Sequence, residues 1–510
     1  MSVRFSTDRR RFLQLSSLGI AGAALLSSAP RQLVADVAAT AQTTGSRTGR
    51  PRKIIFMVSD GMSQAVPSLS EVFSRRFRNR GTHFVELMNN PAVAHGWYET
   101  YSLTSLVTDS AAGGSALGGG SRVVNGALNT LPDGTALKPI NHLAREHGWG
   151  TGVVTTTSVI DATPASFCVA HPTRADPPGI ADKYFDVIDV VMGGGASAFD
   201  KDQRSDKRDL IGDFQKSGYT VLRSRDEMMA LDGEEKRILG LFENGAHPYT
   251  LDHEQSDDLI KTVPTLAEMT DKAIRCLEAN HSDGWLLQVE GARIDHAAHS
   301  NDAPGTIRDQ LAFDDAIGIA LEFASRHPET LIVVTSDHGN SNPGLSGFGA
   351  PTDAMFERVA LAKGTTGVVR SALRDHADSP ADIHQVVLEL LGIDLTGADV
   401  EKVSRILKED YSMVTNRHHL NFVGAFNAVL TNYTGIGWVG TNHTEDYVIL
   451  LAVGPMQERF NKFDRNTDAF RVMADAMGSD FRNPSMTPEQ ARQLAAVQPP
   501  PFREGDIVHA

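Results

Sequence analysis

Four hydrophobic runs in this 510-residue chain each stop or start beside residues that bind metal ions in proteins. Runs of this length without polar alternation are typical of strands buried on both faces of a sheet. In open α/β sheets, ligands bind outside the carboxyl ends of the strands. The pattern therefore predicts an α/β fold with several metal ions held at one edge of its sheet. The runs are 54–59 before Asp60, 285–289 before Glu290, 331–336 before Asp337 and His338, and 447–453 after His443.

The segment after Glu290 carries two further candidate ligands, Asp295 and His299. Being four residues apart, they lie on one face of a helical turn and can bind the same ion. A solvated surface helix is the alternative for this pair, but it does not explain a carboxylate at the end of a buried strand. Asp60 has two oxygens and can bridge two ions. Mixed histidine and carboxylate ligands favour zinc, and an all-oxygen set favours magnesium.

A candidate nucleophile stands in the sequence Thr108-Asp109-Ser110-Ala111. A serine followed by small residues can open a helix, where the helix N-terminus favours negative charge on the serine oxygen. A nearby metal ion would stabilise the same alkoxide. Taken alone, the segment is more typical of an ordinary N-cap serine, so the assignment depends on the neighbouring ligands.

Composition narrows the class of partner. The formal net charge is −15, whereas binding to a nucleic-acid duplex needs clustered Lys and Arg. A small phosphorylated substrate stays compatible, because metal ions reverse the local field inside a cleft. No stretch outside the N-terminus is long and apolar enough to be expected to span a membrane. Cys168 and Cys276 are expected to be two buried free thiols, although an exported location would also permit a disulfide.

Residues 1–41 are predicted to be a removable export leader. Residues 9–13 read Arg-Arg-Arg-Phe-Leu, which resembles the twin-arginine pattern, and the apolar run 13–26 is too short to span a bilayer. Ala-Thr-Ala at 39–41 provides a small-residue cleavage site. The alternative is a short amphipathic or disordered start. A leader of this kind predicts a periplasmic or secreted protein.

Changes in composition divide the rest of the chain. We expect a linker at 42–52, one α/β catalytic domain at 53–482 and a C-terminal tail at 483–510. Within the domain, 341–440 starts Gly- and Pro-rich and then carries helix signals, which predicts an insertion or cap subdomain. Helices are also predicted from Pro264 to Leu277, from Ala303 through Ile317, and from Pro380 to Leu391 with Ser379 and Gly392 as its caps.

Taken together and in this order, the motifs resemble those of the alkaline phosphatases, over nearly all of residues 53–454. Each motif alone is short, but their joint order along one chain is hard to obtain by chance. The matching pieces are Asp60-Gly61-Met62, Thr108-Asp109-Ser110-Ala111, Asp161-Ala162-Thr163-Pro164, Arg174 after His171, Pro-Thr-Leu-Ala-Glu-Met at 264–269, Val289-Glu290-Gly291, Asp295 with His299, Asp337-His338 and His443-Thr444.

The resemblance implies a fold, an activity and a set of roles. The fold is α/β, with a mostly parallel central sheet, helices on both faces, and a helical or irregular insertion before the last metal ligand. The activity is hydrolysis of phosphate monoesters through a phosphoserine, with two Zn²⁺ and one Mg²⁺ as cofactors. The implied roles are Ser110 as nucleophile; Asp295, His299 and His443 on one zinc; Asp60, Asp337 and His338 on the other; Asp60, Thr163 and Glu290 on magnesium; and Arg174 as a clamp on two phosphoryl oxygens.

Two further residues lie beside these ligands in the sequence. Asp161 and His296 are expected to touch phosphate through water or to tune the magnesium site. We expect His296 to alter turnover and metal preference rather than to bind zinc itself. The expected partners are small phosphorylated substrates. Family members are often homodimers, but the sequence leaves the oligomeric state, the physiological substrate and the identity of the third ion open.

Two other functions compete with the monoesterase. A phosphodiesterase of the same superfamily would share the metals, but related diesterases usually carry Thr where this chain has Ser110. A sulfatase is disfavoured, because neither cysteine lies in the motif that sulfatases modify. A non-catalytic metal- or phosphate-binding protein would be expected to lack a ligand, Arg174 or Ser110, and all of them are present.

Overall fold

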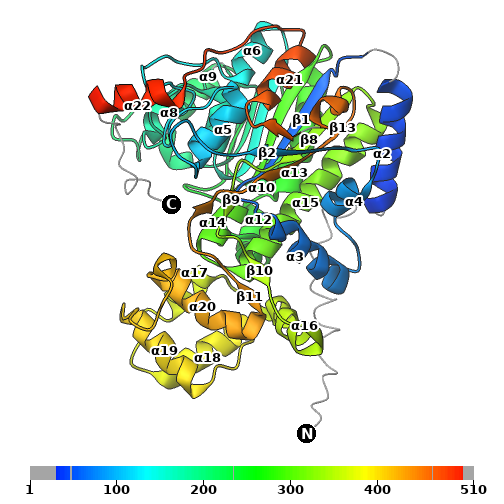
Figure 1. The fold of residues 1–510 in the computed structure, drawn as a ribbon. Helices are drawn as coiled ribbons and strands as arrows, with labels where there is room; N and C mark the ends of the chain where they lie inside the picture. Colours follow the sequence, from blue (N-terminus) through cyan, green and yellow to red (C-terminus); the bar gives the residue numbers. More distant parts are fainter. Residues whose placement is uncertain (1–29, 46–48, 186, 234, 462, 498–510) are drawn as a thin grey trace.

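The computed structural model describes residues 30–45, 49–185, 187–233, 235–461 and 463–497. A ten-stranded sheet crosses the body of the molecule in the order β14-β2-β13-β8-β1-β7-β3-β4-β6-β5. Helices cover both faces of this sheet, and a helical lobe projects from one side of the body (Figure 1). Most neighbouring strands run parallel, so the predicted α/β fold is confirmed.

Three of the predicted runs form the centre of the sheet. They are β1 (Lys53–Ser59), β7 (Trp285–Gly291) and β8 (Thr330–Thr335). Every residue in these strands is buried, and β1 lies between the other two and parallel to both. Val58 of β1 pairs with Glu290 on one side and with Thr335 on the other. This register brings the residues that follow the three strands to one edge of the sheet.

The fourth predicted run is β13 (Val448–Val453), and it runs antiparallel to β8 and to β2 (Ala94–Glu99). Because of this direction, the residues before β13 lie at the edge where the parallel strands end. His443 precedes it in the short strand β12 (His443–Thr444), which pairs with β9 (Gly339–Asn340). The reversed strand thus brings His443 to the predicted metal-binding edge.

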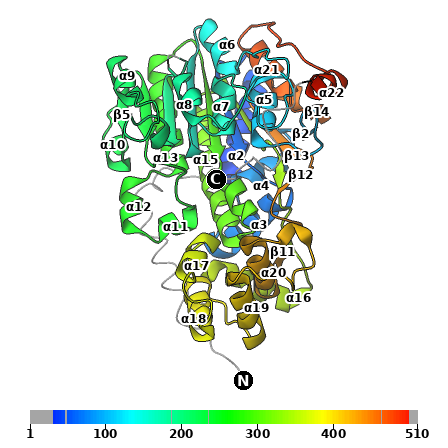
Figure 2. The same cartoon turned by 90° about the vertical axis from the view of Figure 1, so that its left-hand side faces the viewer.

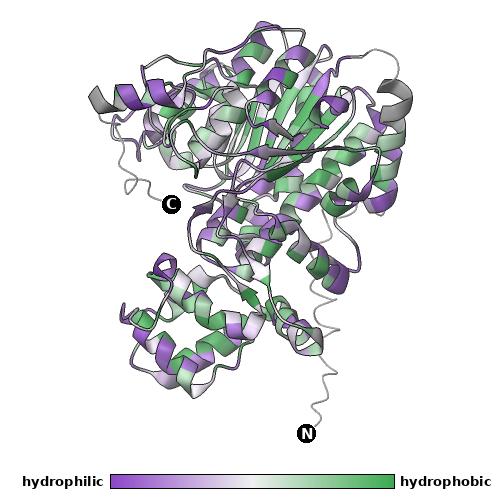
Figure 3. Ribbon diagram, in the orientation of Figure 1, coloured by the Kyte–Doolittle hydropathy of each residue, from purple (hydrophilic) through white to green (hydrophobic). Residues whose placement is uncertain are grey.

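Two helical layers bury opposite sides of β1. Phe56 packs into the layer that contains α5, and Ile55 and Met57 pack into the layer that contains α15. The central strands are accordingly mostly apolar, while the helices carry polar residues on their outer sides (Figure 3). The first layer comprises α5 (Ser110–Gly119), α6 (Ile140–Glu146), α7 (Ala162–Cys168), α8 (Pro177–Asp182), α9 (Leu210–Lys216) and α21 (Asp468–Ala476); the second comprises α2 (Pro30–Gly45), α4 (His83–Asn89), α13 (Leu266–Asn280) and α15 (Ala303–Arg326).

Shorter elements complete the body. The remaining strands are β3 (Gly150–Ser158), β4 (Val190–Gly194), β5 (Thr220–Leu222), β6 (Ile238–Leu241) and β14 (Phe463–Arg465) in the main sheet, and β10 (Gly344–Leu345) paired with β11 (Ile436–Gly437). The remaining helices are α3 (Ala65–Phe73), which continues as a π-helix at Ser74–Arg78, α10 (Arg225–Met229), α11 (Thr250–Glu254), α12 (Asp257–Thr262) and α14 (Arg293–His299).

The predicted helices begin where their capping residues stand. Thr265 and Glu268 form a reciprocal capping box at the start of α13. Asp302 caps α15, which continues to Arg326, beyond the predicted stretch. In the lobe, α18 (Pro380–Leu391) begins after Ser379 and ends at Gly392, whose φ of 65° is the left-handed conformation that glycine adopts without strain. These three predicted helices are confirmed.

The projecting lobe falls within the segment predicted as an insertion or cap, 341–440. It has a hydrophobic core of its own, built around Val387, Val403 and Phe426. The lobe lies beyond the edge where the parallel strands end, on the far side of α14 and α12 (Figures 1 and 2). Its helices are α16 (Gly349–Glu357), α17 (Thr366–Ala372), α18, α19 (Gly397–Leu407) and α20 (Phe422–Thr434).

The expected end of the leader lies within a helix. Helix α2 spans Pro30–Gly45, so it crosses the expected end of the leader at residue 41 and the first part of the expected linker. Leu33, Val34 and Val37 of this helix are buried in the same core as α15 and α4. The arginines at 9–11 and the apolar run 13–26, on which the leader prediction depends, lie outside the described residues.

The first residue of the predicted C-terminal tail, Asn483, is hydrogen-bonded to the body of the protein. Asn483 Nδ2 donates to the carbonyls of Gly119 and Lys138, each at 2.8 Å, and α22 (Pro488–Val497) follows. Residues 498–510 of the predicted tail lie outside the described part. Cys168 and Cys276 are free and buried, as expected. No helix among the described residues is long and apolar enough to cross a membrane.

Candidate active site

Ser110 is the first residue of α5, but it does not cap the helix. The N-cap is Asp109, whose Oδ1 accepts a hydrogen bond of 2.9 Å from the backbone N–H of Ala112. Because the aspartate does the capping, the hydroxyl of Ser110 is left for another partner. Its Oγ lies 3.0 Å from Nε2 of His338. Ser110 therefore sits at the helix N-terminus with its oxygen toward a predicted metal ligand.

The predicted ligands of one zinc come together from α14 and β12. His299 Nε2 lies 3.4 Å from Asp295 Oδ2, and His443 Nε2 lies 3.6 Å from Asp295 Oδ1. Asp295 and His299 occupy successive turns of α14, as their spacing predicts. These ligand atoms lie close enough together for the three residues to hold one ion.

The predicted ligands of the second zinc meet beside Ser110. His338 Nε2 lies 3.4 Å from Asp60 Oδ1 and 3.4 Å from Asp337 Oδ2. Asp60 and Asp337 follow the adjacent parallel strands β1 and β8, and the register of this pair places the two aspartates side by side. Asp60, Asp295 and His338 also lie close enough to share an ion, so the two groups adjoin.

Backbone carbonyls orient all three histidines in the same way. Nδ1 of His443 lies 2.8 Å from the carbonyl of Thr108, Nδ1 of His299 lies 2.7 Å from that of Thr441, and Nδ1 of His338 lies 3.3 Å from that of its neighbour Gly339. A carbonyl only accepts, so Nδ1 carries a proton in each ring, and Nε2 carries a lone pair whenever the ring is neutral.

Two of these lone pairs face each other, because Nε2 of His299 and Nε2 of His443 are 3.0 Å apart. Two neutral imidazole nitrogens at this distance repel unless a proton or a cation lies between them. Fixing Nδ1 on a carbonyl is the usual support for a histidine that binds a metal through Nε2. The geometry of this pair therefore fits a metal ion.

In the predicted magnesium site, Thr163 contacts Asp60, and Glu290 lies close enough for its charge to raise the pKa of Asp60. Thr163 Oγ1 is 3.5 Å from Asp60 Oδ2, and Glu290 Oε2 accepts a hydrogen bond of 2.5 Å from Thr155 Oγ1. Within the described chain, Asp60 Oδ1 and Glu290 Oε1 are buried oxygens without a hydrogen-bond donor. Buried carboxylate oxygens of this kind are costly unless a cation binds them. An all-oxygen set suits magnesium.

The pKa values of the carboxylates reflect this crowding. Burial, together with the charges of Asp337 and Asp295, raises the pKa of Asp60 well above its ordinary value. Burial likewise raises the pKa of Glu290 to about 8. Burial also disfavours the charged form of Asp295, but His299 and His443 outweigh it and lower its pKa. Bound cations would relieve the first two shifts, because they stabilise the ionised carboxylates.

Arg174 is held between two carboxylates next to Ser110. Its Nη2 donates to Asp161 Oδ1 at 2.8 Å, and its Nη1 lies 3.4 Å from Asp109 Oδ2. Burial opposes the charged form of Asp161, but Arg174 outweighs it and lowers the pKa of that carboxyl. Because Asp109 also caps α5, one residue fixes both the helix that carries Ser110 and the guanidinium beside it.

His296 lies on α14 between the ligands Asp295 and His299 but has a different contact. Its Nδ1 accepts a hydrogen bond of 2.6 Å from Nη1 of Arg293. Burial and the charge of Arg293 lower the pKa of His296 to about 4, so its ring is neutral. The structure thus places His296 beside the ligands with one ring nitrogen already engaged.

Three residues with defined contacts in the site were not predicted. Asp109 has the two contacts described above, Thr155 donates to Glu290, and Asn340 Nδ2 donates to Asp295 Oδ1 at 2.7 Å. The signal for Asp109 was present, because Asp is among the preferred N-cap residues. Thr155 and Asn340 act across strands distant in the sequence, and their local sequence carries no such signal.

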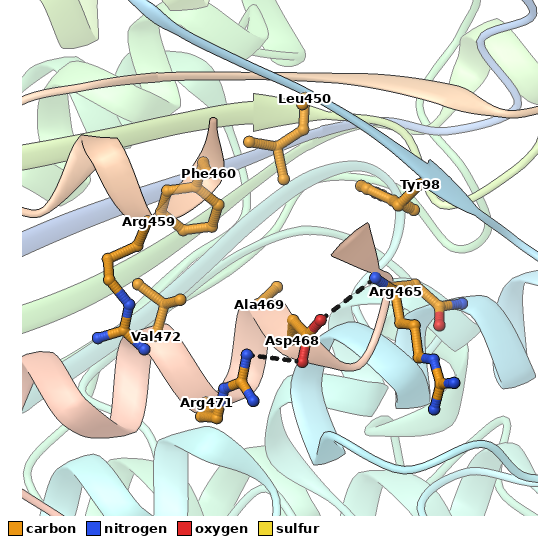
Figure 4. Close-up of a pocket in the computed structure, with 11 residues that line it drawn as sticks. Tyr98, Leu450, Arg459, Phe460, Arg465, Asp468, Ala469, Arg471 and Val472 are labelled. Carbon is orange, nitrogen blue, oxygen red and sulfur yellow. Dashed lines mark hydrogen bonds and ion pairs between the residues drawn. The ribbon is translucent and has the colours of Figure 1, made fainter. Parts of the chain in front are cut away.

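A pocket elsewhere in the body is lined by none of the candidate ligands. It lies beneath α21, between Tyr98, Leu450 and Phe460 (Figure 4). Three arginines line it, but Arg459 pairs with Asp475 at 2.9 Å and Arg471 with Asp468 at 3.0 Å. Carboxylates therefore already compensate the positive charges of Arg459 and Arg471. The candidate active site remains the group of predicted metal ligands around Ser110.

Comparison with known proteins agrees with this geometry. The sequence profile of the alkaline phosphatase family matches residues 51–479. Alkaline phosphatase 3 of Bacillus subtilis is 30% identical over 84% of this chain and 89% of that protein. Streptomycin-6-phosphate phosphatase of Streptomyces griseus is 33% identical over 62% of this chain and 80% of that protein. The crystal structure of Thermus thermophilus alkaline phosphatase superimposes with a TM-score of 0.81 and 33% identity, covering 90% of this chain and 98% of that one.

Proposed function

The chain belongs to the alkaline phosphatase family, and from this premise we propose that it hydrolyses phosphate monoesters with Ser110 as its nucleophile. Its activity as a phosphatase follows from the family. The observation that supports the nucleophile is the position of Ser110 Oγ, 3.0 Å from His338 Nε2 at the N-terminus of α5. Thr163, which also brings a hydroxyl to the cluster, faces the carboxylates of Asp60 and Asp337 instead.

Members of this family depend on metal ions, and the proposed set here is two Zn²⁺ and one Mg²⁺. Asp295, His299 and His443 would hold one zinc, and Asp60, Asp337 and His338 the other. Asp60, Thr163 and Glu290 would hold magnesium. When bound, the ions supply positive charge to the phosphoryl, attacking and leaving oxygens. The fit rests on the converging Nε2 atoms and on the buried carboxylate oxygens without donors.

The protein groups position the substrate for two successive displacements. Arg174 presents a planar fork that can donate to two phosphoryl oxygens, while Asp161 and Asp109 hold it in place. The N-terminus of α5 favours negative charge on Ser110 Oγ. Ser110 attacks the phosphorus, the alcohol leaves from the opposite side, and a phosphoserine forms. Water then attacks the phosphoserine in the second displacement and releases phosphate.

We also propose that the protein is exported by the twin-arginine route to the periplasm or outside the cell. The proposal is supported by the arginines at 9–11, the apolar run 13–26 and the small residues at 39–41. Removal of 1–41 would detach most of α2, including its buried Leu33 and Val37. The intact mass of the exported protein tests this boundary: a chain starting at Gln42 supports it, and a chain retaining α2 contradicts it.

The experiment that tests the activity compares a phosphate monoester with the matching diester. Purified protein with zinc and magnesium is assayed at alkaline pH on p-nitrophenyl phosphate and bis-p-nitrophenyl phosphate. We expect strong monoester turnover that is lost on chelation and in Ser110→Ala. Ser115→Ala, five residues farther along α5, is the matched control and should keep its activity. A preference for the diester would make the protein a phosphodiesterase, and no turnover of either would refute the proposal.

A further inference from the structure

The proposed zinc ligand His299 stands where the body of the protein meets the lobe. It is the last residue of α14, and the turn Ser300-Asn301-Asp302 leads from it into α15. Two helices of the lobe, α17 and α20, form hydrogen bonds with this turn (Figure 1). The lobe therefore contacts the chain directly after a predicted metal ligand.

The first of these contacts comes from Asn427, a buried residue of α20. Its Nδ2 donates to the backbone carbonyl of Ser300, the C-cap of α14, at 2.9 Å. The last carbonyls of a helix have no partner within that helix, so a group from outside has to satisfy them. Asn427 thus fixes the backbone beside His299 from the lobe.

A second contact fixes the ring of the same ligand. Nδ1 of His299 donates to the carbonyl of Thr441 at 2.7 Å, so Nε2 is the nitrogen that would bind zinc. The hydroxyl of Thr441 is tied to the lobe, because it donates to the carbonyl of His418 and accepts from Nδ2 of Asn421, each at 3.2 Å. Asn421 is the N-cap of α20. The helix that carries Asn427 therefore also supports the residue that orients the ring.

The lobe has a separate attachment to the same turn. The backbone N–H of Thr366, the first residue of α17, donates to Oδ2 of Asp302 at 2.5 Å. The other carboxylate oxygen of Asp302 accepts from the N–H of Gly305 at 2.8 Å and caps α15. This attachment involves neither Asn427 nor Thr441. Loss of either of those side chains should therefore leave the lobe docked on the body.

We propose that the lobe supports the zinc site of Asp295, His299 and His443, with Asn427 and Thr441 as the positioning residues. Neither side chain needs to touch the zinc or the substrate. Together they limit the backbone and ring positions open to His299, and a ligand held in its binding orientation binds the ion more tightly. The inference rests on the proposed function, because the zinc site belongs to it.

A role confined to the lobe makes a different prediction for Asn427. Its Nδ2 also lies 3.0 Å from the carbonyl of Val423 in its own helix and 3.1 Å from Oγ1 of Thr366 in α17. If the contact between these two helices were the important one, removing the hydroxyl of Thr366 would have the same effect as removing the amide. Thr366→Val is thus the matched control, because it leaves the contact with Ser300 in place.

The test measures the zinc affinity of the full-length protein by competition with a chromophoric chelator, in the absence of substrate. His299→Ala identifies which bound zinc belongs to the site. Asn427→Leu removes the donor at similar size, and Thr441→Val removes only the hydroxyl. For both we expect the affinity for this zinc to fall about tenfold, as for other groups that orient a metal ligand. The affinity for the second zinc, and both affinities in Thr366→Val, should match the wild type.

Thermal unfolding of the chelated protein is measured for each variant, so that a folding defect is seen apart from a loss of zinc. If Asn427→Leu does not fold, Thr441→Val decides the inference. Three results would overturn it: unchanged zinc affinity in either variant when folded, an equal fall in Thr366→Val, or an equal fall for both zinc ions.

The outcomes for the inference and for the proposed function are separate. If the wild type binds zinc with these effects but hydrolyses no ester, the proposed function fails and the inference stands. If His299→Ala binds zinc as the wild type does, the inference fails, and turnover of the monoester still decides the function.

Discussion

Replacing Glu290 with Gln is predicted to remove a pH dependence of stability from the metal-free protein. Burial raises the pKa of Glu290 to about 8 in the folded protein, compared with an ordinary value of 4.5. Between these two values the folded state holds a proton that the unfolded state has released. The free energy of unfolding of the metal-free protein therefore falls as the pH rises through this window.

The size of the effect follows from the shift in pKa. Each unit corresponds to about 1.4 kcal/mol, so ionising Glu290 in the folded protein costs on the order of 5 kcal/mol across the window. The neighbouring carboxyl of Asp60, whose pKa burial also raises, adds a loss of the same sign. Gln has nearly the same shape and no charge, so the variant should lose the contribution of Glu290 and keep that of Asp60.

Denaturant unfolding of chelated protein at several pH values, from about pH 5 to about pH 9, measures this difference. The wild type should lose stability relative to Glu290→Gln as the pH rises. With zinc and magnesium present the slope should disappear, because the cations take the place of the protons. Glu389→Gln, which removes an exposed carboxylate from α18, controls for net charge. A difference between wild type and Glu290→Gln that stays flat or grows in the opposite direction would refute the reasoning.

Three other outcomes are expected from the same geometry. Arg174→Lys should raise KM for a phosphate monoester about tenfold, since an ammonium cannot donate as a planar fork; kinetics at equal metal loading that match the wild type would contradict this. Thr155→Val should destabilise the protein by about 1–3 kcal/mol in denaturant unfolding by leaving a Glu290 oxygen without its donor, and should weaken magnesium binding in calorimetry. Chelation should abolish turnover and lower the thermal unfolding temperature, and both should return when zinc and magnesium are restored.

The sequence was informative where a local pattern has one physical meaning. The apolar runs became β1, β7, β8 and β13 because short, mostly apolar runs suit strands that are buried on both faces of a sheet. Because the carboxyl ends of parallel strands lie at the same edge of a sheet, the carboxylates that follow β1 and β8 meet there. Asp60 and Asp337 therefore contact the same histidine. Capping residues likewise predicted where α13, α15 and α18 begin, because their side chains satisfy free N–H groups at a helix end.

Other features depend on contacts between distant segments, which no local pattern records. Nothing in residues 447–453 shows that β13 runs antiparallel to β8, although this direction brings His443 to the site. The hydrogen bond from Asn427 to Ser300 joins two segments far apart in the chain. Residues 30–41 match a leader by composition, and their buried face against α15 and α4 is visible only in three dimensions.

The central claim is that Ser110 carries the phosphoryl group between substrate and water. The most direct measurement is to quench the metal-loaded enzyme in acid during turnover of p-nitrophenyl phosphate and to map its peptides by mass spectrometry. We predict one added phosphoryl group on the peptide that contains Ser110 and none in Ser110→Ala. Phosphorylation of another residue, or full turnover by Ser110→Ala with no modified peptide, would contradict the account.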